Sequence, residues 1–60
     1  SPQNYLIKLR LSEAYYQIRF SDKTITDIAL ENGFNDSAYF STCFKSEYNF
    51  TPRDLRHCSN

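Results

Sequence analysis

The stretch ITDIALENGFNDSAYFSTCFK, which runs from Ile25 to Lys45, decides the fold of this chain of 60 residues. Thr24 is a preferred N-cap residue, and Asp27 follows three positions later as a short-armed version of the capping box. Gly33 is suited to end this helix because glycine adopts the left-handed conformation without strain. The stretch therefore predicts a short helix to about Asn32, a glycine stop, a polar turn and a second helix.

The helix after the turn has its own end signals. Asn35 or Asp36 could cap its start, and we favour Asp36. Asn49, which tolerates a left-handed conformation, is expected to end it after about Tyr48. Its apolar arc is formed by Phe40, Cys43 and Phe44.

Two further helices flank this unit. The dipeptide Ser1-Pro2 combines an N-cap with a proline at the first helical position and opens a helix over about 2–20. Thr51-Pro52 repeats the signal and starts a short helix over 52–57, and a frayed tail is expected from His57 onward. No strand signal is present. The sequence thus predicts an all-α fold, a small homeodomain-like bundle with a helix-turn-helix over 25–48.

The first helix carries two apolar stripes on nearly opposite sides. One stripe consists of Ile7, Leu11, Ala14 and Ile18. The other consists of Tyr5, Leu9, Tyr16 and Phe20. Because an ordinary surface helix has one apolar face, we expect this helix to pack on the rest of the chain and also on a second subdomain or partner subunit. The alternative is that the tyrosines are simply solvent-exposed, since tyrosine tolerates water.

Composition narrows the function classes. Seven Lys and Arg residues balance seven Asp and Glu residues, which argues mildly against nucleic acid but leaves the charge distribution open. Two cysteines without CxxC spacing and one histidine predict no metal or cofactor. Reduced cysteines fit better than a disulfide. No signal peptide or membrane-length apolar run is present, so we expect a cytoplasmic protein.

The solvent side of the helix over about 36–48 is expected to contact bases in the DNA major groove. Opposite Phe40 and Phe44 it presents mostly small polar side chains: Ser37, Ala38, Ser41, Thr42 and Lys45. Short hydroxyl groups can hydrogen-bond to base edges, and an alanine can pack on a thymine methyl group. The alternative is that Ser and Thr occupy these positions by drift.

The candidate contacts fall into two groups. The predicted base contacts are Ser37, Ala38, Tyr39, Ser41 and Thr42. The predicted phosphate contacts are Thr24, Thr26, Lys45 and Arg53. Thr24 could be only a helix cap, and Tyr39 could be a wall of the core with its hydroxyl outside. Arg10 could pair with Glu13 or with a core carbonyl group rather than with phosphate.

The string ITDIALENGFNDSAYFSTCFKSEYNFTP resembles the second helix-turn-helix of AraC/XylS-type bacterial transcription regulators. The matching positions are Ile25, Ile28, Ala29, Gly33, Phe34, Tyr39, Phe40, Phe44, Lys45, Thr51 and Pro52. The upstream segment YLIKLRLSEA is similar to the long connecting helix of that family. Three positions depart from the pattern: Gln17 replaces an aliphatic residue, Thr42 a long polar side chain, and Asn49 a glycine.

The resemblance implies sequence-specific binding of double-stranded DNA by a transcription activator or similar regulator. It also implies a first helix-turn-helix subdomain that these residues lack, joined through the connecting helix, and an effector or receiver domain elsewhere in the protein. Such a protein would be bacterial, cytoplasmic, and nucleoid-associated when bound.

Two other function classes compete with DNA binding. A helical protein-interaction module could use the exposed aromatic stripe of the first helix. An enzyme is not expected, because His57 lies in the predicted tail, Cys43 in the apolar arc, and the carboxylates are scattered.

Overall fold

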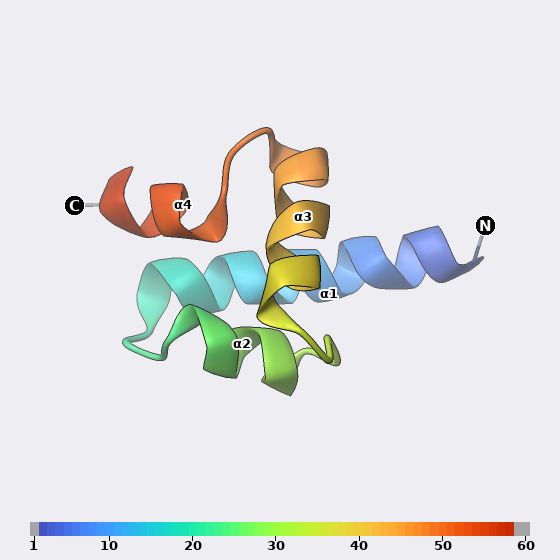
Figure 1. The fold of residues 1–60 in the computed structure, drawn as a ribbon, viewed down its shortest axis with the longest axis horizontal. Coiled ribbons are helices and arrows are strands. Elements are labelled where there is room, and N and C mark those ends of the chain that lie inside the picture. The colour runs from blue at the N-terminus through green and yellow to red at the C-terminus, as the bar shows by residue number, and fades with distance from the viewer. Residues whose placement is uncertain (1, 59–60) are drawn as a thin grey trace.

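The computed structural model describes residues 2–58, with side chains from 5 to 57. It contains four helices, α1 (Pro2–Phe20), α2 (Ile25–Glu31), α3 (Ser37–Tyr48) and α4 (Pro52–Cys58). No strand occurs in this part of the chain, and the all-α class is confirmed. In Figure 1, α2 and α4 lie on either side of α1, and α3 crosses α1 at a steep angle. All three shorter helices contact α1, which therefore organises the bundle.

The helices begin where the sequence predicts, and the differences lie at the C-terminal ends of α2 and α4. α2 ends at Glu31, one residue early, with Asn32 as its C-cap. α4 continues through Cys58, so the prediction of a frayed tail is wrong for His57 and Cys58. Residues 59–60 of that tail, and the predicted N-cap at Ser1, lie outside the described residues.

The core is centred on Phe40 and Phe44 of α3, both with no exposed surface. The Phe40 ring lies 5.1 Å from Phe34 and 5.8 Å from Phe44 between centroids, distances at which aromatic pairs attract each other. The predicted inner stripe of α1 packs against them, with Leu11, Ala14 and Ile18 buried. The other buried hydrophobic residues are Ile28, Ala29, Phe34 and Leu55.

Tyr15 belongs to neither predicted stripe of α1, yet it packs at the edge of the core. Its ring centroid lies 6.2 Å from that of Phe44 and 5.1 Å from that of Tyr48. A period of 3.6 residues places Tyr15 between the two stripes, where its role depends on what lies opposite. Phe44 and Tyr48 of α3 lie opposite Tyr15 and draw it into the core.

The turn between α2 and α3 is a Schellman motif. Gly33 has φ +90°, and its N–H donates to the carbonyl of Leu30 at 3.2 Å. The N–H of Phe34 donates to the carbonyl of Ala29 at 3.0 Å, and the Phe34 side chain is buried. These bonds satisfy the last carbonyls of α2 and direct the chain back over the core. Asn49 ends α3 in the left-handed conformation, φ 69°, as predicted.

Side-chain caps define the helix starts. The Thr24 hydroxyl accepts from the Asp27 N–H at 3.1 Å, and the Asp36 carboxylate accepts from the Ala38 N–H at 2.9 Å. Both caps confirm the sequence prediction. α4 has a reciprocal box, in which the Thr51 N–H donates to the Asp54 carboxylate and the Asp54 N–H donates to the Thr51 hydroxyl.

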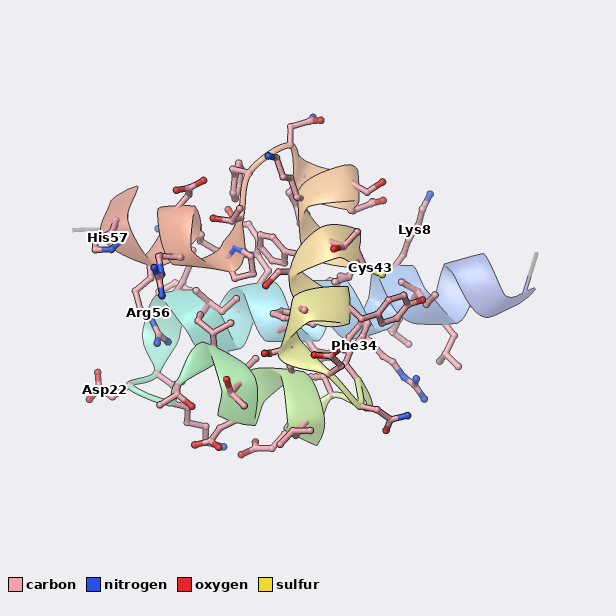
Figure 2. All side chains as sticks on the ribbon, in the orientation of Figure 1. Lys8, Asp22, Phe34, Cys43, Arg56 and His57 are labelled. Atoms are coloured by element: carbon pink, nitrogen blue, oxygen red, sulfur yellow. The ribbon has the colours of Figure 1, made fainter. Side chains whose placement is uncertain are left out.

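Two polar contacts tie the ends of α1 and α2 to the rest of the domain. The Arg56 guanidinium donates to the carbonyls of Ile18, Ser21 and Lys23, so it holds the end of α1 and the following linker against α4 (Figure 2). The Asn32 amide donates to the Gln17 side-chain oxygen at 2.6 Å. Gln17 stands where the AraC/XylS-type pattern has an aliphatic residue. Here its side chain accepts a hydrogen bond from Asn32, the C-cap of α2.

We expect Gly33→Ala to lower the free energy of unfolding by about 1–3 kcal/mol, the cost of a strained backbone conformation. A Cβ atom at position 33 would also lie 2.9 Å from Cζ of Arg10. Urea denaturation of Gly33→Ala and of the double variant Arg10→Ala/Gly33→Ala separates the two causes. Backbone strain predicts that the double variant stays unstable, whereas full recovery would show that the Arg10 contact is the cause.

Hydrogen bonding from the Thr51 backbone, then from its side chain, lowers the pKa of Asp54, and the charges of Lys45 and His57 add to this. A lowered pKa stabilises the fold above the ordinary aspartate pKa of about 3.9, and this stabilisation disappears as the pH falls through the lowered value. Asp54→Asn should therefore reduce the melting temperature at pH 6 but not in strong acid. A difference that persists in acid would mean that the charge is not responsible.

Candidate nucleic-acid interface

The orientation of α3 determines which residues face solvent. Because Phe40 and Phe44 point into the core, the side chains of Ala38, Thr42 and Lys45 lie on the outward face of the helix and are exposed. We call these three residues the outward face of α3. No other helix covers this face among the described residues, so it is open to a macromolecule.

Thr42 lies at the middle of the outward face. Its hydroxyl donates to the Ala38 carbonyl at 3.0 Å, four residues earlier in the helix. This bond holds the hydroxyl close to the helix backbone and uses its proton, so its oxygen can still accept a hydrogen bond. The side chains of Ala38 and Thr42 therefore extend only a short distance from the helix backbone. A binding partner can approach the backbone closely at this point.

Ser37 and Ser41 lie at the edge of α3 rather than on its outward face. Both are half-buried, and they line a pocket of about 350 Å³ where the first turns of α2, α3 and α4 meet. The other residues that line it are Ile25, Thr26, Thr51, Pro52 and Arg53. The prediction of five residues on the side away from Phe40 and Phe44 is therefore wrong for Ser37 and Ser41, since a rotation of 100° per residue turns them toward α4.

Tyr39 lies on the opposite edge of α3. It is 53% exposed, so its ring as well as its hydroxyl reaches solvent, and it is not a wall of the core. The ring packs at 6.1 Å from that of Phe34. A hydrogen bond with the Cys43 side chain raises the pKa of the Tyr39 phenol, which stays protonated at neutral pH. Cys43 itself is a free thiol.

The predicted phosphate contacts do not all lie together. Thr26 and Arg53 line the same pocket as Ser37 and Ser41. Lys45 is exposed at the last turns of α3 and lies near enough to Asp54 to influence its pKa. Thr24 caps α2 and does not line the pocket, so the capping role is shown and a phosphate contact stays a prediction.

Arg10 makes neither of the bonds considered from the sequence. Within residues 5–57 it has no ion pair with Glu13 and no hydrogen bond to a core carbonyl group, and its guanidinium lies against Gly33. It lines a second depression, between α1 and the turn that follows α2, together with Leu6, Phe34 and Tyr39. Arg10 is therefore a packing residue of the turn.

The pocket shared by α2, α3 and α4 is the feature that sequence reasoning missed. Thr26, Ser41 and Arg53 were each singled out, but nothing in their spacing indicates that they meet. The crossing of α3 over the bundle brings them together, and that crossing depends on the core.

Three of the acidic side chains in the described part of the domain have local partners. Asp36 and Asp54 accept hydrogen bonds from backbone N–H groups at the starts of α3 and α4. Glu31 pairs with Lys23 at 2.7 Å. Because these charges are partly compensated where they stand, the neutral total charge does not describe the interface.

The described part of the chain offers neither a membrane-spanning helix nor a cluster of metal ligands. Residues 2–58 include no helix that is long and apolar enough to cross a bilayer. Among the described side chains, no three or more His, Cys, Asp or Glu residues gather as metal ligands.

Comparison with known proteins finds relatives of the helix-turn-helix type. A family model described as a helix-turn-helix domain matches residues 1–57. The HTH-type transcriptional activator RhaS of Mannheimia succiniciproducens is 61% identical over 56 residues, which cover 93% of this chain and 21% of that protein. Proteins of the same name from Yersinia pestis (strain Pestoides F) and Escherichia coli O1:K1 / APEC are 54% and 50% identical over 93% of this chain and 20% of their own lengths.

The chain thus spans about a fifth of the length of these curated relatives. No solved structure gives a significant match. The family match covers nearly all of α1 to α4, and it includes the Gly33 turn and the aromatic core that set the direction of α3. The resemblance inferred from the sequence is confirmed, and the chain belongs to the AraC-type helix-turn-helix family of bacterial transcription regulators.

Proposed function

We propose that this domain binds double-stranded DNA in a sequence-specific manner and regulates transcription, with α3 in the major groove. The outward face of α3 carries the proposal. Ala38 and Thr42 are exposed, small and uncovered, so the helix backbone can approach base edges closely. The major groove is wide enough to admit an α-helix, and its base edges offer hydrogen-bonding groups and thymine methyls at that depth.

Base contacts in this proposal come from Ala38, Tyr39 and Thr42. Ala38 and the Thr42 methyl group suit thymine methyls, and the Thr42 hydroxyl can still accept a hydrogen bond from a base amino group. The protonated Tyr39 phenol can donate from the edge of the helix. Lys45 is exposed farther along α3 and is suited to a phosphate at the groove wall.

The second apolar stripe of α1 has no partner among the described residues. Tyr5, Leu9, Tyr16 and Phe20 are 72%, 47%, 64% and 65% exposed. We infer that this stripe packs on a first helix-turn-helix subdomain of the same protein. An exposed apolar patch of this kind marks an interaction site. The same observation favours one alternative function, a module that binds a helix of another protein through this stripe.

Further parts of the protein belong to the proposal as well. An effector-binding or receiver domain elsewhere in the gene product would supply the regulatory signal, and the protein would act in the cytoplasm on the nucleoid. The names of the relatives favour an activator over a repressor. Because the relatives are named as transcriptional activators, a non-catalytic role is favoured over an enzyme.

Substitution of Thr42 tests base recognition. Thr42→Ala removes the hydroxyl and the methyl group from the outward face, so we expect the ranking of DNA sites to change at one or two base pairs by about 5- to 100-fold. The salt dependence of binding should stay unchanged because no charge is lost. The measurement is selection from a random duplex library with the complete gene product.

Ser12→Ala is the matched control, because the exposed Ser12 hydroxyl also donates to a helix carbonyl, that of Leu9, at 2.8 Å. This variant should leave the selected sequence unaltered. An identical selected sequence for Thr42→Ala and the unmodified protein would argue against base contact by this face.

Substitutions in the second apolar stripe of α1 test whether it packs on another subdomain of the same protein. Leu9→Ser/Tyr16→Ser should leave the unfolding of the isolated 60 residues within about 0.5 kcal/mol, because exposed positions carry little stability. In the complete gene product the same change should lower both the melting temperature and DNA affinity. Normal stability and DNA binding, combined with loss of binding to another protein, would favour the interaction module instead.

A further inference from the structure

Most serine and threonine hydroxyl groups in this domain are already hydrogen-bonded within it. Those of Ser12, Ser21 and Thr42 donate to helix carbonyls, and those of Thr24 and Thr51 accept from backbone N–H groups at caps. Within residues 5–57, four hydroxyls have no such partner, namely Thr26, Ser37, Ser41 and Ser46. Three of these four line the single pocket between α2, α3 and α4.

The remaining lining of this pocket defines its chemistry. Arg53 is exposed at its rim and forms neither a hydrogen bond nor an ion pair with any other described residue. No aspartate or glutamate lines the pocket. Ile25 and Pro52 add an apolar wall. One cation, three free hydroxyl groups and an apolar wall suit an anion that is attached to an apolar group.

We propose that this pocket, hereafter the hydroxyl pocket, binds one phosphodiester of the DNA backbone together with its deoxyribose. The proposal rests on the DNA-binding function above and assigns a partner to this site. Arg53 pairs with the phosphate charge, and the hydroxyls of Thr26, Ser37 and Ser41 donate to its oxygens. Ile25 and Pro52 pack on the sugar.

This assignment changes the role of two residues. Ser37 and Ser41 were expected to contact bases, but they are half-buried and turned toward α4, whereas Thr42, 100° around the helix from Ser41, is exposed on the outward face. A base edge at the centre of the groove is reached from the outward face. The strand that borders the groove lies to the side of α3, where the hydroxyl pocket opens. Ser37 and Ser41 therefore set the position of α3 and do not select the sequence.

The experiment uses the complete gene product and a duplex that it selects from a random library. Single methylphosphonate linkages, which remove the charge of one phosphate at a time, are placed along both strands. At one position we expect neutralisation to weaken binding by the unmodified protein about 10- to 100-fold, as for loss of a charge-assisted hydrogen bond. The same linkage should weaken Arg53→Gln clearly less than it weakens the unmodified protein, because the ion pair with that phosphate is already broken.

The serine variant separates positioning from base recognition. Ser41→Ala should reduce affinity for every duplex by a similar factor and should reduce the effect of the same methylphosphonate. Ser46→Ala, which removes an unpartnered hydroxyl outside the hydroxyl pocket, is the matched control and should do neither. Arg53→Gln should also lower the slope of log affinity against log salt by about 1, whereas Arg19→Gln on α1 should leave it unchanged.

The outcomes distinguish this proposal from the function on which it rests. If sequence-specific binding is observed but every sensitive phosphate remains equally sensitive in Arg53→Gln and Ser41→Ala, the hydroxyl pocket is not a phosphate site. A changed base preference in Ser41→Ala would also overturn it, because that serine would then contact a base. If the unmodified protein selects no sequence at all, the DNA-binding proposal fails first, and the pocket assignment fails with it.

Discussion

The packing of Phe40 and Phe44 against the inner stripe of α1 is the constraint on which the rest of this domain depends. Both rings are fully buried, and they connect Phe34 in the turn with Tyr15 on α1. At 60 residues a domain buries only about 60% of its unfolded surface, so a few large aromatic side chains carry much of the stability. Their position one helical turn apart sets both the place and the rotation of α3.

That rotation divides the small polar residues of α3 between two surfaces. Thr42 faces outward, where a groove can be contacted, and Ser41 faces the hydroxyl pocket together with Arg53. Neighbours in sequence thus lie on different surfaces. The polar caps at the starts of α3 and α4 support the same arrangement, because they fix the first turns of the two helices that border the hydroxyl pocket.

The two faces of α1 explain how a small unit can belong to a larger one. Its inner stripe supports the helix-turn-helix, and its outer stripe of Tyr5, Leu9, Tyr16 and Phe20 stays exposed. The Arg56 contacts with the end of α1 hold that helix firmly relative to α4. Anything that packs on the outer stripe therefore contacts the same helix that supports α3.

The sequence by itself determined the helices, their caps and the family. Thr24, Asp36, Gly33 and Asn49 act within one or two turns of the chain, so their effects are visible locally. Only the tertiary structure decided that Tyr15 joins the core, that α4 continues to Cys58, and that Thr26, Ser41 and Arg53 share one pocket. Those features depend on the angle at which α3 crosses the bundle, and that angle is set by side-chain packing between distant segments, which local periodicity does not encode.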